Sequence, residues 1–165
     1  MGPTMDPTIA AGISLRIPHL PLRIKAHSER ALAVTSRLQE LGLNVCYPGL
    51  PDHPDHQLFE YLHCDEYGYG GVFTLDVGDE EAANALMSCL QNEQRFGYLA
   101  VSLGYFDTLM SCSGSSTSSE MSEENKASAG ISPGLLRISI GYTGTLEQRW
   151  TQLLTALRQT GLVPA

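Results

Sequence analysis

Short apolar runs of strand length alternate along this chain with longer segments of helical periodicity, and this alternation restricts the fold more than any other feature. The strand-like runs are residues 44–47, 71–77, 98–103, 107–110 and 135–140. The helical segments are residues 19–41, 56–64, 79–90 and 145–157. Strands that alternate with helices predict an α/β or α+β domain, and we expect helices to cover one face of its sheet. Strand order and direction do not follow from this pattern.

The ends of the predicted helices carry residues with specific capping roles. Gly42 is expected to end helix 19–41, since glycine readily adopts the left-handed conformation found at helix ends. Asp79 is placed to cap helix 79–90, with Glu80 and Glu81 in its first turn. The residues of segment 19–41 predicted to face the core are Leu22, Ala26, Ala31, Val34, Leu38 and Leu41. In segment 145–157 they are Leu146, Trp150, Leu153, Leu154 and Leu157.

Size and charge exclude several classes of protein. The 165 residues suit one domain with its own core, preceded by a connecting arm over residues 1–18, which hold three prolines and two glycines. A net charge of -8 with no basic stripe argues against nucleic-acid binding. No apolar run approaches the roughly 20 residues of a membrane helix, and no secretory signal is present. The four cysteines form no C-x-x-C pair, so we predict reduced thiols and a cytoplasmic location.

Arg137 is the residue that points most directly to chemistry. It lies in the middle of run 135–140, where alternation places Arg137 and Ser139 on one face of the strand. Leu136, Ile138 and Ile140 fall on the other face. A guanidinium presents a rigid fork that binds a carboxylate bidentately, and an amino-acid substrate offers such a carboxylate. The pattern alone also fits an arginine on the exposed face of an edge strand.

Two further polar segments allow alternative interpretations. The Ser/Thr-rich run 111–119 is either a solvated, flexible linker or a loop whose hydroxyls line a polar pocket. The metal-like residues are His53, His56, His63 and Cys64, which would suit a metal-dependent hydrolase. Zinc sites usually bring four ligands together, and Pro54 disrupts the helical placement of the first two histidines. A solvated helix N-terminus is therefore the favoured interpretation of that segment.

An ordered set of segments resembles the C-terminal domain of the Cys/Met-metabolism enzymes, which depend on pyridoxal phosphate (PLP). The matching segments, in the family's order and near its spacing, are residues 22–31, 45–49, 53–56, 102–104, 107–109, 116–117, 130–131 and 136–141. The resemblance covers nearly the whole chain. Within the family, residues 1–7, 102–105 and 111–119 look most like the plant methionine γ-lyases.

This resemblance implies a fold, a cofactor and three site residues. The fold is the small C-terminal domain of a fold-type I PLP-dependent enzyme over residues 19–165, a mainly antiparallel sheet with helices on one face, joined to a large domain by the arm 1–18. The arginine matching Arg137 binds the substrate α-carboxylate, and the residues matching Ser102 and Thr117 lie near that carboxylate and the cofactor. Ser118 stands where the family often has histidine. The implied partners are an amino-acid substrate, methionine or a relative of it, and further subunits in a homo-oligomer.

The family's Schiff-base lysine has no counterpart in this sequence. The only lysines are Lys25 and Lys126, and neither lies in the Ser/Thr-x-Thr-Lys context that precedes the helix resembling residues 22–31. The parent reaction splits methionine to methanethiol, 2-oxobutanoate and ammonia, with lysine-bound PLP as the electron sink. We therefore expect the chain alone to be inactive. The alternative is a stand-alone carboxylate-binding or subunit-interaction module derived from such an enzyme.

Overall fold

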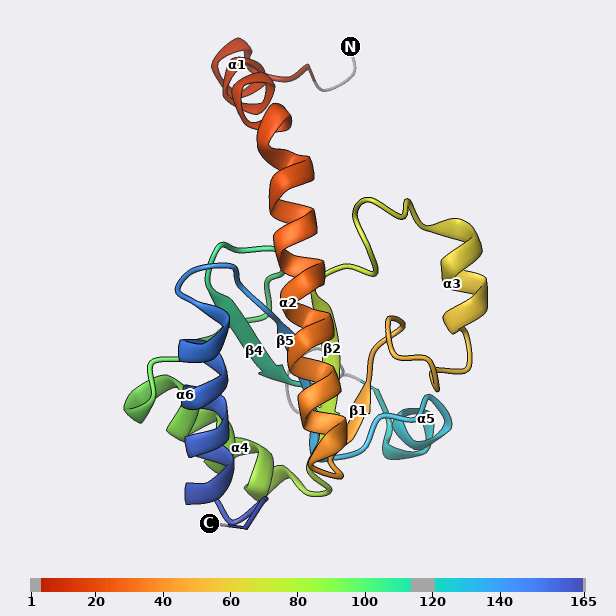
Figure 1. Ribbon diagram of the computed structural model, residues 1–165, viewed down its shortest axis with the longest axis vertical. Coiled ribbons are helices and arrows are strands. Elements are labelled where there is room, and N and C mark those ends of the chain that lie inside the picture. The colour runs from red at the N-terminus through yellow and green to blue at the C-terminus, as the bar shows by residue number, and fades with distance from the viewer. Residues whose placement is uncertain (1–3, 114–120, 165) are drawn as a thin grey trace.

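A five-stranded sheet forms the centre of the molecule (Figure 1). The computed structural model describes residues 4–113 and 121–164. The strands are β1 (Asn44–Cys46), β2 (Val72–Asp76), β3 (Gly97–Leu99), β4 (Thr108–Cys112) and β5 (Leu135–Ser139). They lie in the order β1-β2-β5-β4-β3, and each neighbouring pair is antiparallel except β3 and β4, which are parallel. The mainly antiparallel sheet that the resemblance implies is therefore confirmed.

Three helices cover one face of this sheet. The helical elements are α1 (Pro7–Arg16), η1 (Ile17–His19), α2 (Leu20–Glu40), α3 (His56–Leu62), α4 (Glu80–Ser88), η2 (Cys89–Glu93), α5 (Glu123–Ser128) and α6 (Leu146–Gln159). Figure 1 shows α2, α4 and α6 across the same side of the strands, with α3 and α5 off to one side. The predicted mixed class, with helices on one face, is confirmed. Within the described part of the chain, no helix is long and apolar enough to cross a membrane.

The core fills the space between the sheet and its covering helices. Alternate residues of the strands point into it, and those almost fully buried include Phe73, Leu75, Met110, Leu136 and Ile138. The helical segments contribute Ala31, Val34, Leu38, Leu86, Leu90, Leu153 and Leu157. Burial of these apolar side chains, at about 25 cal/mol per Å², is the main favourable contribution to folding. Because side chains alternate along a strand, the opposite face of the sheet carries the polar residues Thr74, Ser111, Arg137 and Ser139 together with the apolar Val72, Leu109 and Leu135.

Both predicted helix caps are present. Gly42 follows α2 with a φ of 77°, in the left-handed region that favours glycine. Asp79 precedes α4, and its Oδ1 accepts a hydrogen bond from the Ala82 N–H at 2.8 Å. A single residue therefore marks each of these helix ends. Caps of this kind satisfy backbone groups that the helix itself leaves unpaired.

Helix α2 departs from the predicted inward face at both ends. Leu22 is 70% exposed and Leu41 is 42% exposed, whereas the polar residues His27 and Ser28 are buried. Figure 1 shows that the N-terminal end of α2 extends beyond the sheet, and Leu22 belongs to the first turn of this helix. Burial of His27 is compensated by a hydrogen bond between its Nδ1 and the Ile140 carbonyl oxygen at 2.5 Å.

The chain leaves the sheet earlier after β3 than the apolar run 98–103 predicts. β3 ends at Leu99, and the following residues turn toward β5, where the Gly104 N–H donates to Ser139 Oγ at 3.0 Å. β4 in turn continues to Cys112, beyond the predicted end at residue 110. The first residues of the Ser/Thr-rich run thus belong to a buried strand, and residues 114–119 of that run lie outside the described residues.

Candidate functional site

Arg137 lies in the central strand of the sheet. β5 runs between β2 and β4, and Arg137 is directly opposite Thr74 on one side and Ser111 on the other. Its sequence neighbours Leu136 and Ile138 are fully buried in the core, so the Arg137 side chain is on the face away from α2, α4 and α6. The predicted alternation is confirmed. The alternative of an exposed arginine on an edge strand is wrong, since Arg137 is half-buried and flanked on both sides.

The structure brings two of the three predicted site residues together. Nη2 of Arg137 donates to the main-chain oxygen of Ser102 at 3.4 Å. The hydrogen bond from Gly104 to Ser139 fastens the same segment to the same face of β5. Thr117, the third predicted residue, lies outside the described residues. Ser102 and Arg137, which are 35 positions apart, thus lie side by side on the open face of the sheet.

The polar face around Arg137 has unused hydrogen-bonding capacity. Among the residues that the structure describes, the Nε atom of Arg137 and the Oγ atom of Ser111 are both buried without a hydrogen-bond partner. Within residues 4–113 and 121–164, no ion pair joins Arg137 to a carboxylate. An uncompensated guanidinium beside hydroxyl groups is suited to hold a small anion such as a carboxylate. The sequence analysis included Ser111 only as part of the run 111–119, as a linker or a pocket-lining loop, because the strand register that places it opposite Arg137 is not visible in the sequence.

A buried arginine in α6 fixes the loop that precedes β4. Nη2 of Arg149 donates to Asp107 Oδ1 and to Thr143 Oγ1, each at 2.8 Å. Gly141 allows this loop to approach closely, since an added Cβ would lie 2.5 Å from the Asp107 Cα atom. These contacts hold the end of the segment that begins at Ser102, and so they support its position against Arg137.

The histidines of the metal-like cluster make ring and main-chain contacts. The Tyr69 ring stacks between the rings of His56 and His63, with centroids 5.3 and 4.6 Å away. His53 Nδ1 accepts a hydrogen bond from the Asp55 N–H at 3.1 Å. Among the described residues, no group of three or more His, Cys, Asp or Glu side chains is placed to hold a metal ion. This segment therefore offers no support for the metal-dependent hydrolase.

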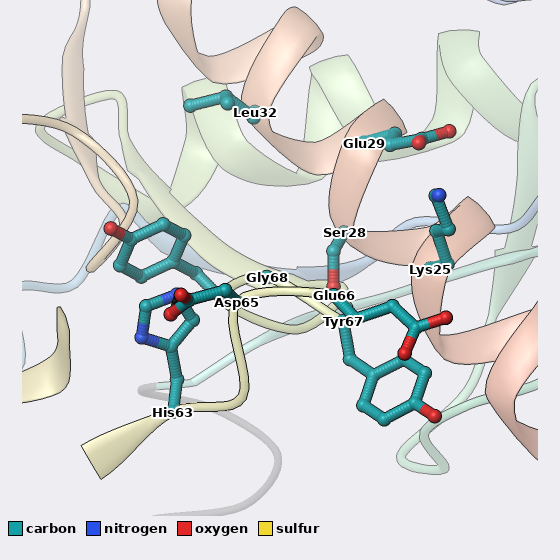
Figure 2. A pocket seen from close by; sticks show the side chains of 10 residues that line it. Lys25, Ser28, Glu29, Leu32, His63, Asp65, Glu66, Tyr67 and Gly68 are labelled. Atoms are coloured by element: carbon teal, nitrogen blue, oxygen red, sulfur yellow. Dashed lines mark ion pairs between the residues drawn. The ribbon is translucent and has the colours of Figure 1, made fainter. Parts of the chain in front are cut away.

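A separate cavity of about 320 Å³ lies between α2 and the loop 63–69 (Figure 2). Lys25 and Glu29 line it from α2, and Asp65 and Glu66 line it from the loop. Burial and nearby carboxylates raise the pKa of Tyr69, which also lines this cavity. Neither Arg137 nor Ser102 belongs to its lining, so this cavity is distinct from the polar face of β5.

Neither lysine of the chain is placed to carry PLP beside Arg137. Lys25 is exposed on α2, which covers one face of the sheet, whereas Arg137 is on the other face. Lys126 lies on the short helix α5, outside the sheet. The lysine needed for a covalent PLP linkage is therefore missing from this face. What the described residues do offer is a cation and hydroxyls that could take a carboxylate.

Solved structures of the same fold define the class of protein. A Campylobacter jejuni protein described as an O-acetylhomoserine (thiol)-lyase, whose structure contains a pyridoxyl-lysine monophosphate, matches with a TM-score of 0.76 and 29% identity. The match covers 85% of this chain and 32% of that chain. The cystathionine gamma synthase of Xanthomonas oryzae, solved with cystathionine, matches with a TM-score of 0.75 and 33% identity over 87% of this chain and 36% of that chain. The fold is thus that of a part of the PLP-dependent enzymes that handle sulfur-containing amino acids.

Sequence comparison then assigns the family. The sequence pattern of the Cys/Met metabolism PLP-dependent enzymes matches residues 1–148, and the chain belongs to this family. It is 57% identical to the methionine gamma-lyase of Arabidopsis thaliana, over 92% of this chain and 34% of that protein. It is 32% identical to the cystathionine gamma-lyase of Bacillus subtilis, over 76% of this chain and 32% of that protein. The chain spans about a third of the length of these relatives.

Proposed function

We propose that this chain is the C-terminal part of a PLP-dependent carbon–sulfur lyase of the methionine γ-lyase type. Its role in such an enzyme is to hold the α-carboxylate of an amino-acid substrate, methionine or a relative of it. The observation that carries the proposal is the position of Arg137 in the central strand, next to Ser102 and without an ion-pair partner in the described part of the chain. The 57% identity to a protein named methionine gamma-lyase supports methionine as the substrate.

Each site residue has a distinct part in this role. The planar guanidinium of Arg137 donates two parallel hydrogen bonds to a carboxylate and supplies its positive charge. Ser102 lies against Arg137 and limits where the guanidinium can point. Thr117 is assigned to the same carboxylate and cofactor region on the strength of the resemblance. PLP, when bound in enzymes of this family, supplies the electron sink for elimination.

We further propose that the chain is inactive without a PLP-binding partner. Lys25 and Lys126 are its only lysines, and neither lies beside Arg137. The parent reaction, release of methanethiol, 2-oxobutanoate and ammonia from methionine, would then need the longer sequence that the relatives have. The domain boundaries, with an arm over 1–18 and a domain over 19–165, and the cytoplasmic location, belong to the same proposal.

Calorimetric titration with L-methionine tests the carboxylate-binding role. We expect weak binding by the chain, at least about tenfold weaker binding by Arg137→Gln, and no binding of L-methioninol, which lacks the carboxylate. Arg158→Gln, a change at an exposed arginine of α6, is the matched control and should bind as the unmodified chain does. Equal affinity of Arg137→Gln and the unmodified chain would remove Arg137 from the site. Methanethiol release by the chain with PLP alone would contradict its inactivity.

A subunit-interaction module is the second candidate function, and one observation favours it. Large apolar side chains of α1, η1 and the start of α2 are exposed, namely Ile9, Ile13, Leu15, Ile17, Leu20 and Leu22. Exposed apolar surface of this kind marks protein interfaces. The occupant we propose is the PLP-binding part of a full-length family member, because the relatives are about three times as long as their match to this chain. Co-elution with a full-length homologue, abolished by Leu15→Asp with Leu22→Asp, would support this candidate.

A further inference from the structure

Two buried polar atoms on neighbouring strands lack hydrogen-bond partners within the described part of the chain, and they belong to residues that lie opposite each other. Ser111 on β4 and Arg137 on β5 are directly opposite in the antiparallel register. Directly opposite residues have their Cβ atoms about 5 Å apart on the same face of the sheet. The orphaned atoms are Ser111 Oγ, which can accept a hydrogen bond, and Arg137 Nε, whose N–H must donate one. Buried polar atoms normally have hydrogen-bond partners, so two neighbouring atoms without partners require an explanation.

The guanidinium of Arg137 is at present turned toward a weak partner. Its Nη2 reaches the Ser102 carbonyl oxygen at 3.4 Å, the long end of the hydrogen-bond range. A carboxylate would compete successfully for the guanidinium, since charge-assisted bidentate pairs are stronger than a single bond to a carbonyl. Movement of the guanidinium off Ser102 changes the direction of the Nε–H. On the neighbouring strand β4, directly opposite Arg137, the Ser111 hydroxyl is an acceptor that is unused among the described residues.

We infer that Ser111 is a positioning residue for Arg137, whose Nε–H donates to Ser111 Oγ when the two Nη nitrogens take a ligand carboxylate. This inference rests on the proposed carboxylate-binding role of Arg137. In this arrangement the Nε–H of Arg137 bonds to Ser111 on β4, and the two Nη nitrogens bind the ligand carboxylate. The hydrogen bond to Ser111, formed together with the contacts to the ligand, holds the guanidinium in its ligand-bound orientation and so strengthens carboxylate binding.

The other flank of Arg137 offers a matched control. Thr74 on β2 is opposite Arg137 in the same row of the sheet, so it is as close in register as Ser111. Its side chain is half-buried, and its hydroxyl is not among the buried atoms that lack a partner. Ser139, the remaining hydroxyl on β5, already accepts from the Gly104 N–H. Ser111 is therefore singled out because its hydroxyl, unlike that of Thr74, is buried without a hydrogen-bond partner among the described residues.

Side-chain NMR of the ¹⁵N-labelled chain tests the inference directly. The Nε–H signal of Arg137 is assigned by its loss in Arg137→Gln, and its hydrogen exchange is measured with L-methionine and with L-methioninol. We expect L-methionine alone to slow this exchange, by about tenfold, which is the change expected from one hydrogen bond to a charged group. Ser111→Ala should abolish the slowing, Ser111→Thr should restore it, and Thr74→Val should leave it intact.

The outcomes separate this inference from the proposed function. Slowing that persists in Ser111→Ala, or the absence of any slowing in the unmodified chain, overturns the role of Ser111. Binding of L-methionine that still depends on Arg137 in calorimetry would then leave the proposed function standing. Failure of that calorimetric test, by contrast, removes the carboxylate site itself. Circular dichroism and the thermal midpoint of each variant identify any general loss of structure.

Discussion

At the scale of single residues, Arg149 contributes more to stability than its position in α6 would indicate. Its guanidinium donates to Asp107, to Thr143 and to the main-chain oxygens of Arg95 and Phe96. Arg149→Met keeps the aliphatic bulk but leaves a half-buried carboxylate and several carbonyls without their donor. We expect the free energy of unfolding to fall by about 3 kcal/mol, the usual cost of breaking a buried ion pair from one side. Urea unfolding with linear extrapolation measures the change.

Arg158→Met is the control for that measurement. Arg158 lies in the last turn of the same helix and is exposed, so its replacement should change the free energy of unfolding by no more than about 0.5 kcal/mol. A similar loss in both variants would mean that charge in α6, and not the contacts of Arg149, determines the result.

We expect the exposed cysteine thiols to react with an alkylating agent faster than the buried ones. Cys89 is buried, its Sγ donates to Gln159 Oε1 at 3.3 Å, and burial raises the pKa of its thiol, followed by the effect of Glu93. A raised pKa leaves less of the reactive thiolate at pH 8, so alkylation slows. Iodoacetamide followed by peptide mass mapping should label the exposed Cys46 and Cys64 first and label Cys89 only after unfolding. Early labelling of Cys89 in the native chain would contradict the packing of η2 against α6.

The sequence predicts which residue carries the charge but not what surrounds it. Alternation along 135–140 places Arg137 on a polar face, and the resemblance adds Ser102, which the structure places in contact with it. The position of Ser111 opposite Arg137 could not be predicted, because the register of β4 against β5 creates it and the sequence shows Ser111 only as part of the run 111–119. Long-range pairing of strands is a tertiary property, and a single sequence contains only weak signals for it.

At the scale of elements, the cap of α4 offers a clean test of local stability. Asp79 accepts from the Ala82 N–H and places a negative charge at the helix N-terminus. Asp79→Ala should lower the free energy of unfolding by about 1 kcal/mol, whereas Asp79→Ser, which keeps a capping oxygen, should lower it by less. Urea unfolding of the two variants gives the comparison. Equal losses would mean that the charge or the packing of Asp79, and not its cap, stabilises α4.

Elements with strong periodicity and end signals are predicted well, and short ones are not. Gly42 and Asp79 mark real helix ends, and β5 matches its predicted run within one residue. α5 has six residues and no apolar periodicity, so nothing in the sequence predicts it. The apolar run 98–103 overstates β3, because pairing with β4 ends after the hydrogen bond from the Ala100 N–H to the Met110 carbonyl oxygen, and Gly104 then bonds to Ser139.

At the scale of the whole molecule, the chain has the sheet face that we propose to bind a carboxylate, and its only two lysines lie on α2 and α5 and not in the strand that carries Arg137. Aldimine formation at a specific site needs an amine activated by its surroundings and contacts that hold the cofactor. Lys25 is exposed at the rim of a cavity that includes the carboxylates of Glu29 and Glu66, which repel an anionic phosphate. Incubation with PLP, borohydride reduction and intact-mass measurement should therefore give only sparse labelling, spread over Lys25, Lys126 and the N-terminal amine.

A full-length family member treated in parallel is the positive control for that experiment, and it should take up one pyridoxyl group per chain. Lys25→Arg should lower the sparse labelling of this chain only by the share that Lys25 contributes as one of three amines. A single stoichiometric adduct at Lys25 or Lys126 would contradict the expectation, because it would mean that this chain builds a cofactor site of its own. In that case the inactive-alone proposal would fail, while the proposed carboxylate-binding role of Arg137 would still be decided by the calorimetric comparison with Arg137→Gln.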